Sequence, residues 1–519
     1  MDRKPGLLSG LLLGIILGIP LAAVFYLGDQ LRLVTFIPFD IFDWHSRVLP
    51  GGLITGVIDI LIHIIRFFNL GPTAAVAKLA EQLIAMSMFV GITALAGLAV
   101  ALVIRITPRV PAVSGGLVGG LLTVIVLLIE LKLKRFMPVS AVFTAFLFIG
   151  WSALVGIVLS KGRGIVRILS VSLPLALTVT LSGYAVSRMM SGMSGSDVPL
   201  TDVRADSQGG LIFSNVMAVE KRSGILPAPG TRTELTPKER FFRVDIDTTP
   251  PIVNSRSWRM RTSGLFDRPR QISYADLMKY PEVTQPITLC CISNPVAGDL
   301  IGTVFFTGIR LRDFIHDLGI RKEAKGLMVR SVDGYYETVS QEDMNDPRTL
   351  LVYGMNGRTL TPEQGFPVRI YIPGRYGMKQ PKWVISIEAI SPPDSGFWVD
   401  RGWDREADVQ TLSVIDTVAQ DAARDGRIPI GGIAFAGGRG IKSVQIQVDD
   451  GQWRETEILN PPLGPLTWVI WRYDWPHQGG RHTFRVRAVD GNGVLQSASP
   501  APPHPKGATG YHQLTLEIR

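Results

Sequence analysis

The chain has 519 residues, a formal net charge of +9 and a mean hydropathy of +0.24. Its hydrophobic fraction of 46% is ordinary for a soluble protein, so the positive mean hydropathy indicates that apolar residues are concentrated in part of the chain. No block of lysine and arginine interleaved with aromatic residues stands out, so we expect no nucleic-acid partner. The only two cysteines are adjacent, which excludes a disulfide framework and a zinc site of four cysteines.

The apolar residues are concentrated in residues 1–190, which predict a transmembrane region of five helices. Five runs without charged residues are long enough to cross a bilayer core about 30 Å thick, which takes roughly 20 helical residues. They are residues 6–28, 83–104, 110–129, 136–160 and 168–187. A lipid bilayer is therefore an expected partner, and we expect a multi-pass protein of the cell membrane.

A sixth stretch, residues 53–70, contains Asp59, His63 and Arg66. Ionisable groups inside a membrane often have a function, so a sixth span is the alternative. Because three such side chains are unfavourable in lipid, we expect an amphipathic helix at the membrane surface instead. With five spans, the half of the chain that follows would lie on the extracytoplasmic face. Lysine and arginine divide evenly between the two sides and do not decide the orientation.

Three further segments follow the apolar region. Residues 191–240 are rich in Ser, Gly and Pro and predict a linker. Residues 241–415 predict a mixed α+β domain, because alternating strands such as "PVRIYIPG" and "KWVISIEAI" are separated by helical segments such as "LRDFIHDL". Residues 416–519 predict a β-sandwich, because short strands such as "VQIQV" and "FRVRAV" precede Asp-Gly turns.

The adjacent cysteines, Cys290 and Cys291, have three possible explanations. A disulfide between neighbours needs a strained ring, which makes it the least favourable of the three. Two buried and inert thiols are common in proteins. A metal ligand is the third explanation, since a thiolate suits a soft transition metal.

Residues 241–519 resemble the sulfite-oxidase family of molybdopterin-dependent oxidoreductases, as a membrane-anchored, bacterial-type member. The resemblance depends on several motifs in order, each weak alone. They are "FFRVD" (241–245), "TLCCISN" (288–294), "QGFPVR" (364–369), "GRYGMKQPKW" (374–383), "GFWVDRGW" (396–403) and "GATGYHQL" (507–514). The family often carries a C-terminal immunoglobulin-like dimerisation domain, so the resemblance implies such a sandwich and a homodimer through it.

The resemblance also implies the residues of the site. In the family pattern Thr-Leu-x-Cys-x-x-Asn the cysteine binds molybdenum, which selects Cys291 as the metal ligand and leaves Cys290 as a packed thiol. The implied cofactor is molybdenum-molybdopterin, with Arg243 as a further catalytic residue. The residues implied to hold the cofactor are Arg369, Lys382, Asn294, Gln364, Arg375 and Lys379. For the basic residues among these, a solvated strand face is the alternative explanation.

Three departures from the family pattern concern the site. Gln364 replaces the family's histidine, and Pro295 and Val296 occupy positions where sulfite oxidases have arginines. No tyrosine follows the Lys-Trp strand, so Phe397 or Trp398 would line the pocket.

The resemblance implies an oxidoreductase that transfers an oxygen atom at a sulfur-type or N-oxide substrate. Its partners would be a small oxo-acceptor or oxo-donor and a redox carrier, either a cytochrome or a quinone-linked protein. The alternative is a membrane-anchored, non-enzymatic ligand-binding protein on a degenerate sulfite-oxidase fold.

Overall fold

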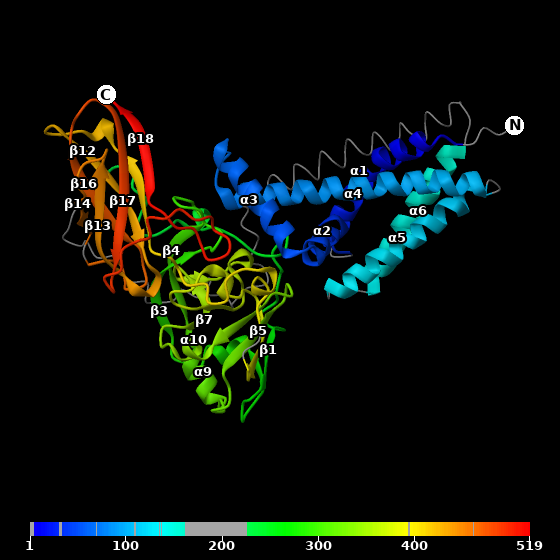
Figure 1. Ribbon diagram of the computed structural model, residues 1–519. Coiled ribbons are helices and arrows are strands. Elements are labelled where there is room, and N and C mark those ends of the chain that lie inside the picture. Colours follow the sequence, from blue (N-terminus) through cyan, green and yellow to red (C-terminus); the bar gives the residue numbers. More distant parts are fainter. Residues whose placement is uncertain are drawn as a thin grey trace. The chain divides into compact units, whose positions relative to one another are not determined.

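The computed structural model describes residues 5–30, 34–68, 70–107, 110–133, 135, 138–160, 226–392, 395–459 and 461–519. It divides into two compact units, which are coloured along the chain in Figure 1. Unit 1 comprises Met1–Leu49, Val76–Val198 and Ile246–Thr248. Unit 2 comprises Pro50–Ala75, Pro199–Asp245 and Thr249–Arg519.

Unit 1 consists of long apolar helices. Its elements are α1 (Leu7–Gln30), α2 (Ile37–Val48), most of α4 (Thr73–Ile106), α5 (Pro111–Leu133) and α6 (Pro138–Ser160). Four of them, α1, α4, α5 and α6, are long and apolar enough to cross a membrane, which indicates a multi-pass membrane protein. Four of the predicted spans fall in these helices, although α4 begins at Thr73 rather than at residue 83. The fifth, residues 168–187, lies outside the described residues, so the expected extracytoplasmic location stays a prediction.

Helices α5 and α6 approach each other through glycine. A Cβ atom added at Gly115 would lie 2.1 Å from the carbonyl oxygen of Ser152, and one at Gly119 would lie 2.3 Å from that of Phe148. Small residues four apart on one helix face allow such close backbone packing in membranes, where no hydrophobic effect drives helices together. These two backbones can therefore reach van der Waals contact only because Gly115 and Gly119 have no side chain.

A second feature of unit 1 is a buried cluster of charged residues outside the apolar spans. Arg135, which follows α5, pairs with Asp40 and Asp43 of α2, the latter at 3.1 Å. The same guanidinium lies 2.5 Å from Asp247, and Arg47 also lies 2.5 Å from that carboxylate. Buried charges are tolerated only when they are paired in this way. The cluster therefore fixes the segment Ile246–Thr248 to the helices of unit 1.

Two sheets form the middle of unit 2. Both combine strands from distant parts of the sequence, and β1 pairs with β10 in parallel whereas the other pairs are antiparallel. The first has the order β2 (Gln271–Ser273), β1 (Arg259–Gly264), β10 (Val384–Ile390), β5 (Gly326–Ser331) and β6 (Tyr336–Ser340). The second has the order β3 (Val283–Cys290), β4 (Ile301–Arg310), β7 (Leu350–Met355) and β8 (Arg358–Thr359), with β9 (Arg369–Tyr371) also paired to β7.

Short helices connect these strands. The α-helices of unit 2 are α3 (Gly51–Phe67), α8 (Tyr274–Leu277), α9 (Leu311–Asp317) and α10 (Gln341–Asn345). The 3-10 turns are η1 (Lys238–Arg240), η2 (Pro362–Gln364), η3 (Gly377–Lys379), η4 (Val399–Arg401), η5 (Gln420–Ala422) and η6 (Gly437–Arg439). The mixed α+β layout predicted from the sequence is confirmed.

Two antiparallel sheets end the chain and share one core. One has the order β11 (Leu412–Val418), β12 (Arg427–Phe435), β16 (Val469–Pro476) and β15 (Glu457–Ile458). The other has the order β14 (Arg454–Glu455), β13 (Ile441–Val448), β17 (Gly480–Asp490) and β18 (His512–Ile518). Trp471 from the first sheet and Phe484 and Val486 from the second are fully buried together, as alternation predicts. The immunoglobulin-like character of these sheets and their role in a homodimer stay predictions.

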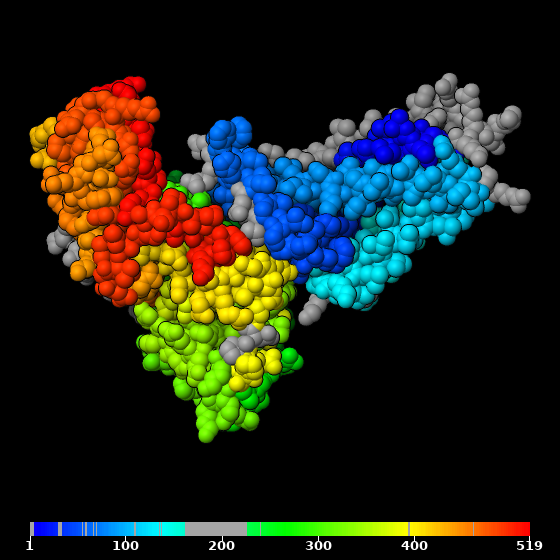
Figure 2. Space-filling view, viewed as in Figure 1, coloured from blue at the N-terminus to red at the C-terminus, as the bar shows by residue number. Residues whose placement is uncertain are grey.

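Segments far apart in sequence complete unit 2. Thr236, in the described part of the predicted linker, exchanges backbone and side-chain hydrogen bonds with Thr303 of β4. Arg232 forms an ion pair of 2.9 Å with Asp416 of β11. Near the C-terminus, the ring of His504 lies 5.0 Å from that of Trp403, and Figure 2 shows the red segment around residue 500 against the yellow segment around residue 400.

The packing of α5 on α6 gives a prediction with a matched control. Gly119→Ala should force the two backbones apart, and overpacking of this kind costs about 1–3 kcal/mol. Gly120→Ala should be neutral or slightly stabilising, because no atom lies within 4 Å of its added Cβ and alanine is the better helix former. Each variant is heated in detergent, and the loss of its monodisperse peak in size-exclusion chromatography gives a melting temperature. The two melting temperatures are then compared. Equal melting temperatures for the two variants would contradict the close approach.

Candidate active site

The adjacent cysteines lie where β3 ends and have different surroundings. Cys290 pairs with Ile301 in the β3–β4 ladder, and its side chain packs in a hydrophobic cluster that includes Tyr376. The backbone N–H of Cys291 donates to the carbonyl oxygen of Leu300, and its sulfur lies 3.0 Å from the hydroxyl oxygen of Ser293. Successive side chains of a strand point to opposite faces, so the two thiols are not equivalent.

Hydrogen-bond donors distinguish Cys291 as the better candidate ligand. Burial raises the pKa of both thiols. At Cys291 this effect is opposed by the Ser293 hydroxyl and by the backbone N–H groups of Ser293 and Ile292, which lower the pKa. At Cys290 the charge of Cys291 raises the pKa further, and the opposing side-chain donor is Asn294. Donors around sulfur stabilise the thiolate, which is the form that binds a metal.

A loop and a tyrosine complete the surroundings of the cysteines. The loop carrying η3 approaches the cysteine backbone closely, because a Cβ added at Gly377 would lie 3.5 Å from the carbonyl oxygen of Cys290. The hydroxyl of Tyr335 donates to the carbonyl oxygen of Met378 in the same loop. Burial, and then the charges of neighbouring acids and of Cys291, raise the pKa of Tyr335. Tyr335 is therefore a neutral hydroxyl close to the candidate metal ligand.

Sequence reasoning missed Tyr335, because it lies in the turn before β6 and belongs to none of the recognised motifs. The aromatic residues that were proposed instead lie beside it. The ring of Phe397 is 5.5 Å from that of Tyr335, and the ring of Trp398 is 5.2 Å from that of Phe397. A contact between residues distant in sequence leaves no signal in a single sequence, so only the fold could identify this tyrosine.

The buried cations Arg369 and Lys382 form a cluster at the other end of the β3–β4 hairpin. The guanidinium of Arg369 lies over the ring of Phe306, at 5.1 Å, and donates 3.1 Å to the carbonyl oxygen of Gln364. The ammonium of Lys382 lies 3.0 Å from Asp245. Phe306 is five residues along β4 from the residue that faces Cys290, a separation of roughly 17 Å.

Burial makes the positive charge of this cluster unfavourable. It lowers the pKa of Arg369 to about 10 and that of Lys382 to about 8. The charges of Arg243 and Arg369 lower the pKa of Lys382 further, whereas Asp245 raises it. Asp245 also accepts from Arg243 at 2.7 Å, so two cations share this carboxylate, and Arg369 lies close enough to affect the pKa of Lys382. The cluster therefore favours binding of an anion.

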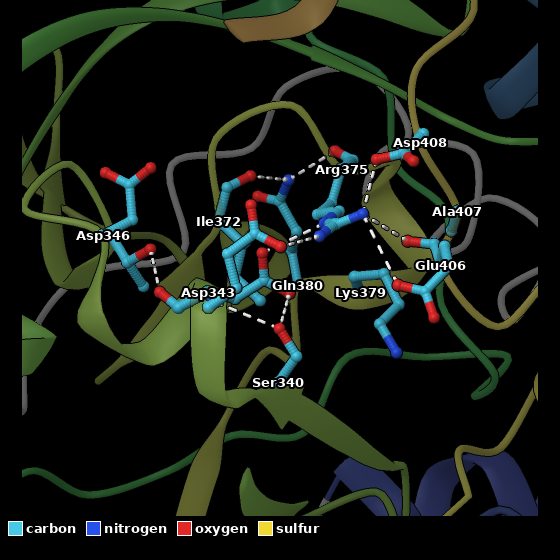
Figure 3. Close-up of polar contacts among 12 residues, drawn as sticks. Ser340, Asp343, Asp346, Ile372, Arg375, Lys379, Gln380, Glu406, Ala407 and Asp408 are labelled. Carbon is cyan, nitrogen blue, oxygen red and sulfur yellow. Dashed lines mark hydrogen bonds and ion pairs between the residues drawn. The ribbon is translucent and has the colours of Figure 1, made fainter. Parts of the chain in front are cut away.

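Two other predicted cofactor ligands, Arg375 and Lys379, are paired with carboxylates. Figure 3 shows Arg375 between Asp343 and Asp408, at 3.0 and 2.5 Å. The ammonium of Lys379 lies 2.5 Å from the fully buried carboxylate of Glu337. Both cations thus stabilise the loop around η3, and their charge is already balanced in this structure.

The predicted polar ligands Asn294 and Gln364 bond to the backbone. The side-chain oxygen of Asn294 accepts from the N–H of Leu300 at 2.9 Å, which shapes the loop after the cysteines. The side-chain oxygen of Gln364 accepts from the N–H of Thr361 at 3.1 Å and caps η2. A cavity of ≈ 20 Å³ beside Cys290 is large enough for about one water.

An unsatisfied donor tests whether these residues fit an anionic cofactor. The Nε atom of Arg369 is buried and has no hydrogen-bond partner among the described residues. Buried donors are normally satisfied, and a guanidinium is well suited to a phosphate oxygen. Arg369 lies in the cationic cluster, and the thiol of Cys291 lies at the other end of the β3–β4 hairpin. Together these residues fit a cofactor that carries both a phosphate and a metal.

Comparisons with known proteins agree with this chemistry. The family described as "Oxidoreductase molybdopterin binding domain" matches residues 247–398. The chain is 28% identical over 279 residues to a sulfite oxidase of Arabidopsis thaliana, covering 44% of this chain and 71% of that protein. It is 29% identical over 319 residues to a sulfite oxidase of Gallus gallus, covering 52% and 69%. It is also 29% identical over 277 residues to an NADH nitrate reductase of Volvox carteri, covering 42% and 32%.

Replacing Arg369 should separate cofactor binding from stability. Arg369→Met removes a charged donor, so the variant should bind molybdopterin about ten- to a hundredfold more weakly, equivalent to about 1.5–3 kcal/mol. The cofactor-free form should be at least as stable as the parent, because a buried and poorly paired charge is removed. Pterin content and thermal melting of the purified proteins measure the two effects. Arg321→Met, at an exposed arginine, is the control, and full pterin occupancy in Arg369→Met would contradict the role.

Replacing each cysteine in turn should distinguish the metal ligand from its neighbour. Cys291→Ser should lose bound molybdenum and turnover, because a hydroxyl is a poor substitute for a soft thiolate ligand. Cys290→Ser should keep most of both, since its side chain packs in the hydrophobic cluster and is not the implied metal ligand. Elemental analysis and activity of the two variants provide the measurement. Similar behaviour of both variants would show that the assignment is wrong.

Proposed function

Because this chain belongs to the sulfite-oxidase family of molybdopterin oxidoreductases, we propose that it is a membrane-anchored enzyme that moves an oxygen atom to or from a weakly charged sulfur or nitrogen centre. The bound molybdenum cofactor supplies two-electron oxygen-atom transfer. Cys291 would hold the metal, and Arg369 and Lys382 would hold the anionic end of the cofactor. The single observation that carries the proposal is the absence of unpaired positive charge, among the described residues, in the loop that follows Cys291.

That loop is neutral. Its residues Pro295 and Val296 replace the arginines of sulfite oxidases, and Ala297 and Gly298 continue it. A small dianion such as sulfite is expensive to desolvate unless cations surround it. A substrate that carries little charge, such as a sulfoxide or an N-oxide, has no such requirement.

Two other arginines are candidates to replace the missing charge, and both are paired. Arg439 lies 2.8 Å from Asp490 and donates to the carbonyl oxygen of Val409 at 3.0 Å. Arg243 lies 2.7 Å from Asp245. Binding a dianion at either position would require breaking an ion pair that exists already. This supports a weakly charged substrate.

The electrons require a separate carrier. The membrane part of the chain contains only His45 and His63 among the seven histidines, so it has few axial ligands for haem. We therefore propose that a cytochrome or a quinone-linked protein exchanges electrons with the enzyme, and that the catalytic domain lies on the extracytoplasmic face. Protease accessibility of residues 240–519 in spheroplasts tests the location.

Steady-state assays test the substrate. With an oxidised artificial acceptor, sulfite should saturate the enzyme poorly; with a reduced artificial donor, sulfoxides or N-oxides should be turned over more efficiently. Val296→Arg should lower the KM for sulfite about ten- to a hundredfold, because it adds one charged hydrogen-bonding partner. Val296→Gln, similar in length but neutral, is the control. A low KM for sulfite in the unmodified enzyme, with no turnover of sulfoxides, would contradict the proposal.

A further inference from the structure

Helix α3 carries an apolar stripe that no part of unit 2 covers. Leu53, Val57, Ile60, Ile64 and Phe67 follow one another at intervals of four and three residues, which places them on one face of a helix. Their exposed fractions are 59%, 57%, 62%, 42% and 75%, which are high for large apolar side chains. Figure 2 shows the atoms of this segment, in mid-blue, on the surface of the molecule. A continuous exposed stripe of this kind marks an interaction surface.

The opposite face of α3 is buried, and residues at or just beyond both ends of the helix contact other parts of unit 2. Ile62 and Ile65, which lie away from the stripe, are 9% and 1% exposed. At the beginning of α3, a Cβ added to Gly51 would lie 2.6 Å from the carbonyl oxygen of Arg401 in η4. After the helix, the backbone N–H of Thr73 donates to Asp299 at 2.7 Å. The stripe is therefore the outward face of a helix that belongs to the cofactor-carrying unit.

Three properties of α3 favour lipid as the partner of this stripe. The first residue of α4, a candidate membrane span, follows Phe67 by six residues, and such a connection reaches at most about 20 Å. The 17 residues of α3 extend only about 25 Å, which is shorter than the bilayer core of about 30 Å. The stripe ends in Phe67, which is 75% exposed, and Phe68 and Leu70, just after the helix, are 65% and 54% exposed; such apolar and aromatic groups are typical of a surface-lying helix.

We propose that α3 lies in the plane of the membrane surface, with its apolar stripe inserted among the lipid acyl chains, and that it fixes the cofactor-carrying unit to the bilayer. The α3 stripe would be immersed along its whole length, at a constant depth of about 5–10 Å. Contact with the bilayer would thus involve the catalytic unit itself as well as the helices of unit 1.

Spin labels on the full-length protein in lipid nanodiscs test the proposal. A single cysteine is introduced at each stripe position in turn, as Leu53→Cys, Val57→Cys, Ile60→Cys, Ile64→Cys and Phe67→Cys, and labelled with a nitroxide. The native cysteines are buried, and the unsubstituted protein reports any background labelling. Ile252→Cys, 77% exposed and outside α3, is the matched control for a water-facing apolar site. Pterin content verifies that each variant is folded.

The relative accessibility of each label to oxygen and to a water-soluble nickel chelate gives the result. We expect the ratio to favour oxygen at all five stripe positions, with the same depth at each, and to favour nickel at position 252. Nickel accessibility at the stripe equal to that at position 252 would overturn the proposal. A label depth that increases from position 53 to position 60 and decreases again to position 67 would indicate a spanning helix and would also overturn the proposal. Exclusion of both reagents, or spin–spin broadening between copies, would show that a protein covers the stripe and would also overturn it.

Discussion

The positive charge that Arg369 and Lys382 bring together, away from water, is the constraint on which the candidate site depends. Arg369 is buried and its Nε atom has no hydrogen-bond partner among the described residues, whereas Lys382, which is nearly buried, shares the carboxylate of Asp245 with Arg243. Burial lowers the pKa of both groups, so the protein alone disfavours the charges that its fold brings together. Gly365, with φ +104°, allows this arrangement, because a Cβ there would lie 2.9 Å from Lys382. An anion that entered this cluster would relieve the unfavourable charge, which supports the proposal that the anionic end of the cofactor binds there.

The neighbouring basic residues serve a different purpose, although the sequence places all of them within one short segment. Arg375 and Lys379 are balanced by Asp343, Asp408 and Glu337. A charge that is paired in the folded protein stabilises the loop around η3 and offers little to a ligand. A charge without an adequate partner offers most of its interaction energy to a ligand. This distinction favours Arg369 and Lys382, rather than Arg375 and Lys379, as the residues that we propose to bind the cofactor.

The sequence predicted those features that depend on local pattern. Apolar length predicted the helices of unit 1, and alternation predicted strands such as β13 and β17, because both follow from periodicity along one segment. The resemblance to a family correctly indicated the cofactor and the enzyme class. The pairing of Arg375 and Lys379 could not be predicted, because their carboxylate partners lie far away in sequence. Tyr335 was missed for the same reason, and so was the attachment of Asp247 to the helices of unit 1.

The adjacency of the two cysteines has a consequence for how the protein is made. Both thiols are free and buried, and the whole chain contains no third cysteine with which either could cross-link. Neighbouring cysteines rarely form a disulfide, because the ring would be strained. Folding of one chain therefore requires neither a thiol oxidase nor a disulfide isomerase, and incorrect disulfide pairing within the chain cannot delay it. Disulfide formation therefore does not restrict this polypeptide to a reducing or an oxidising compartment, and the thiol of Cys291, the proposed metal ligand, is free in this structure.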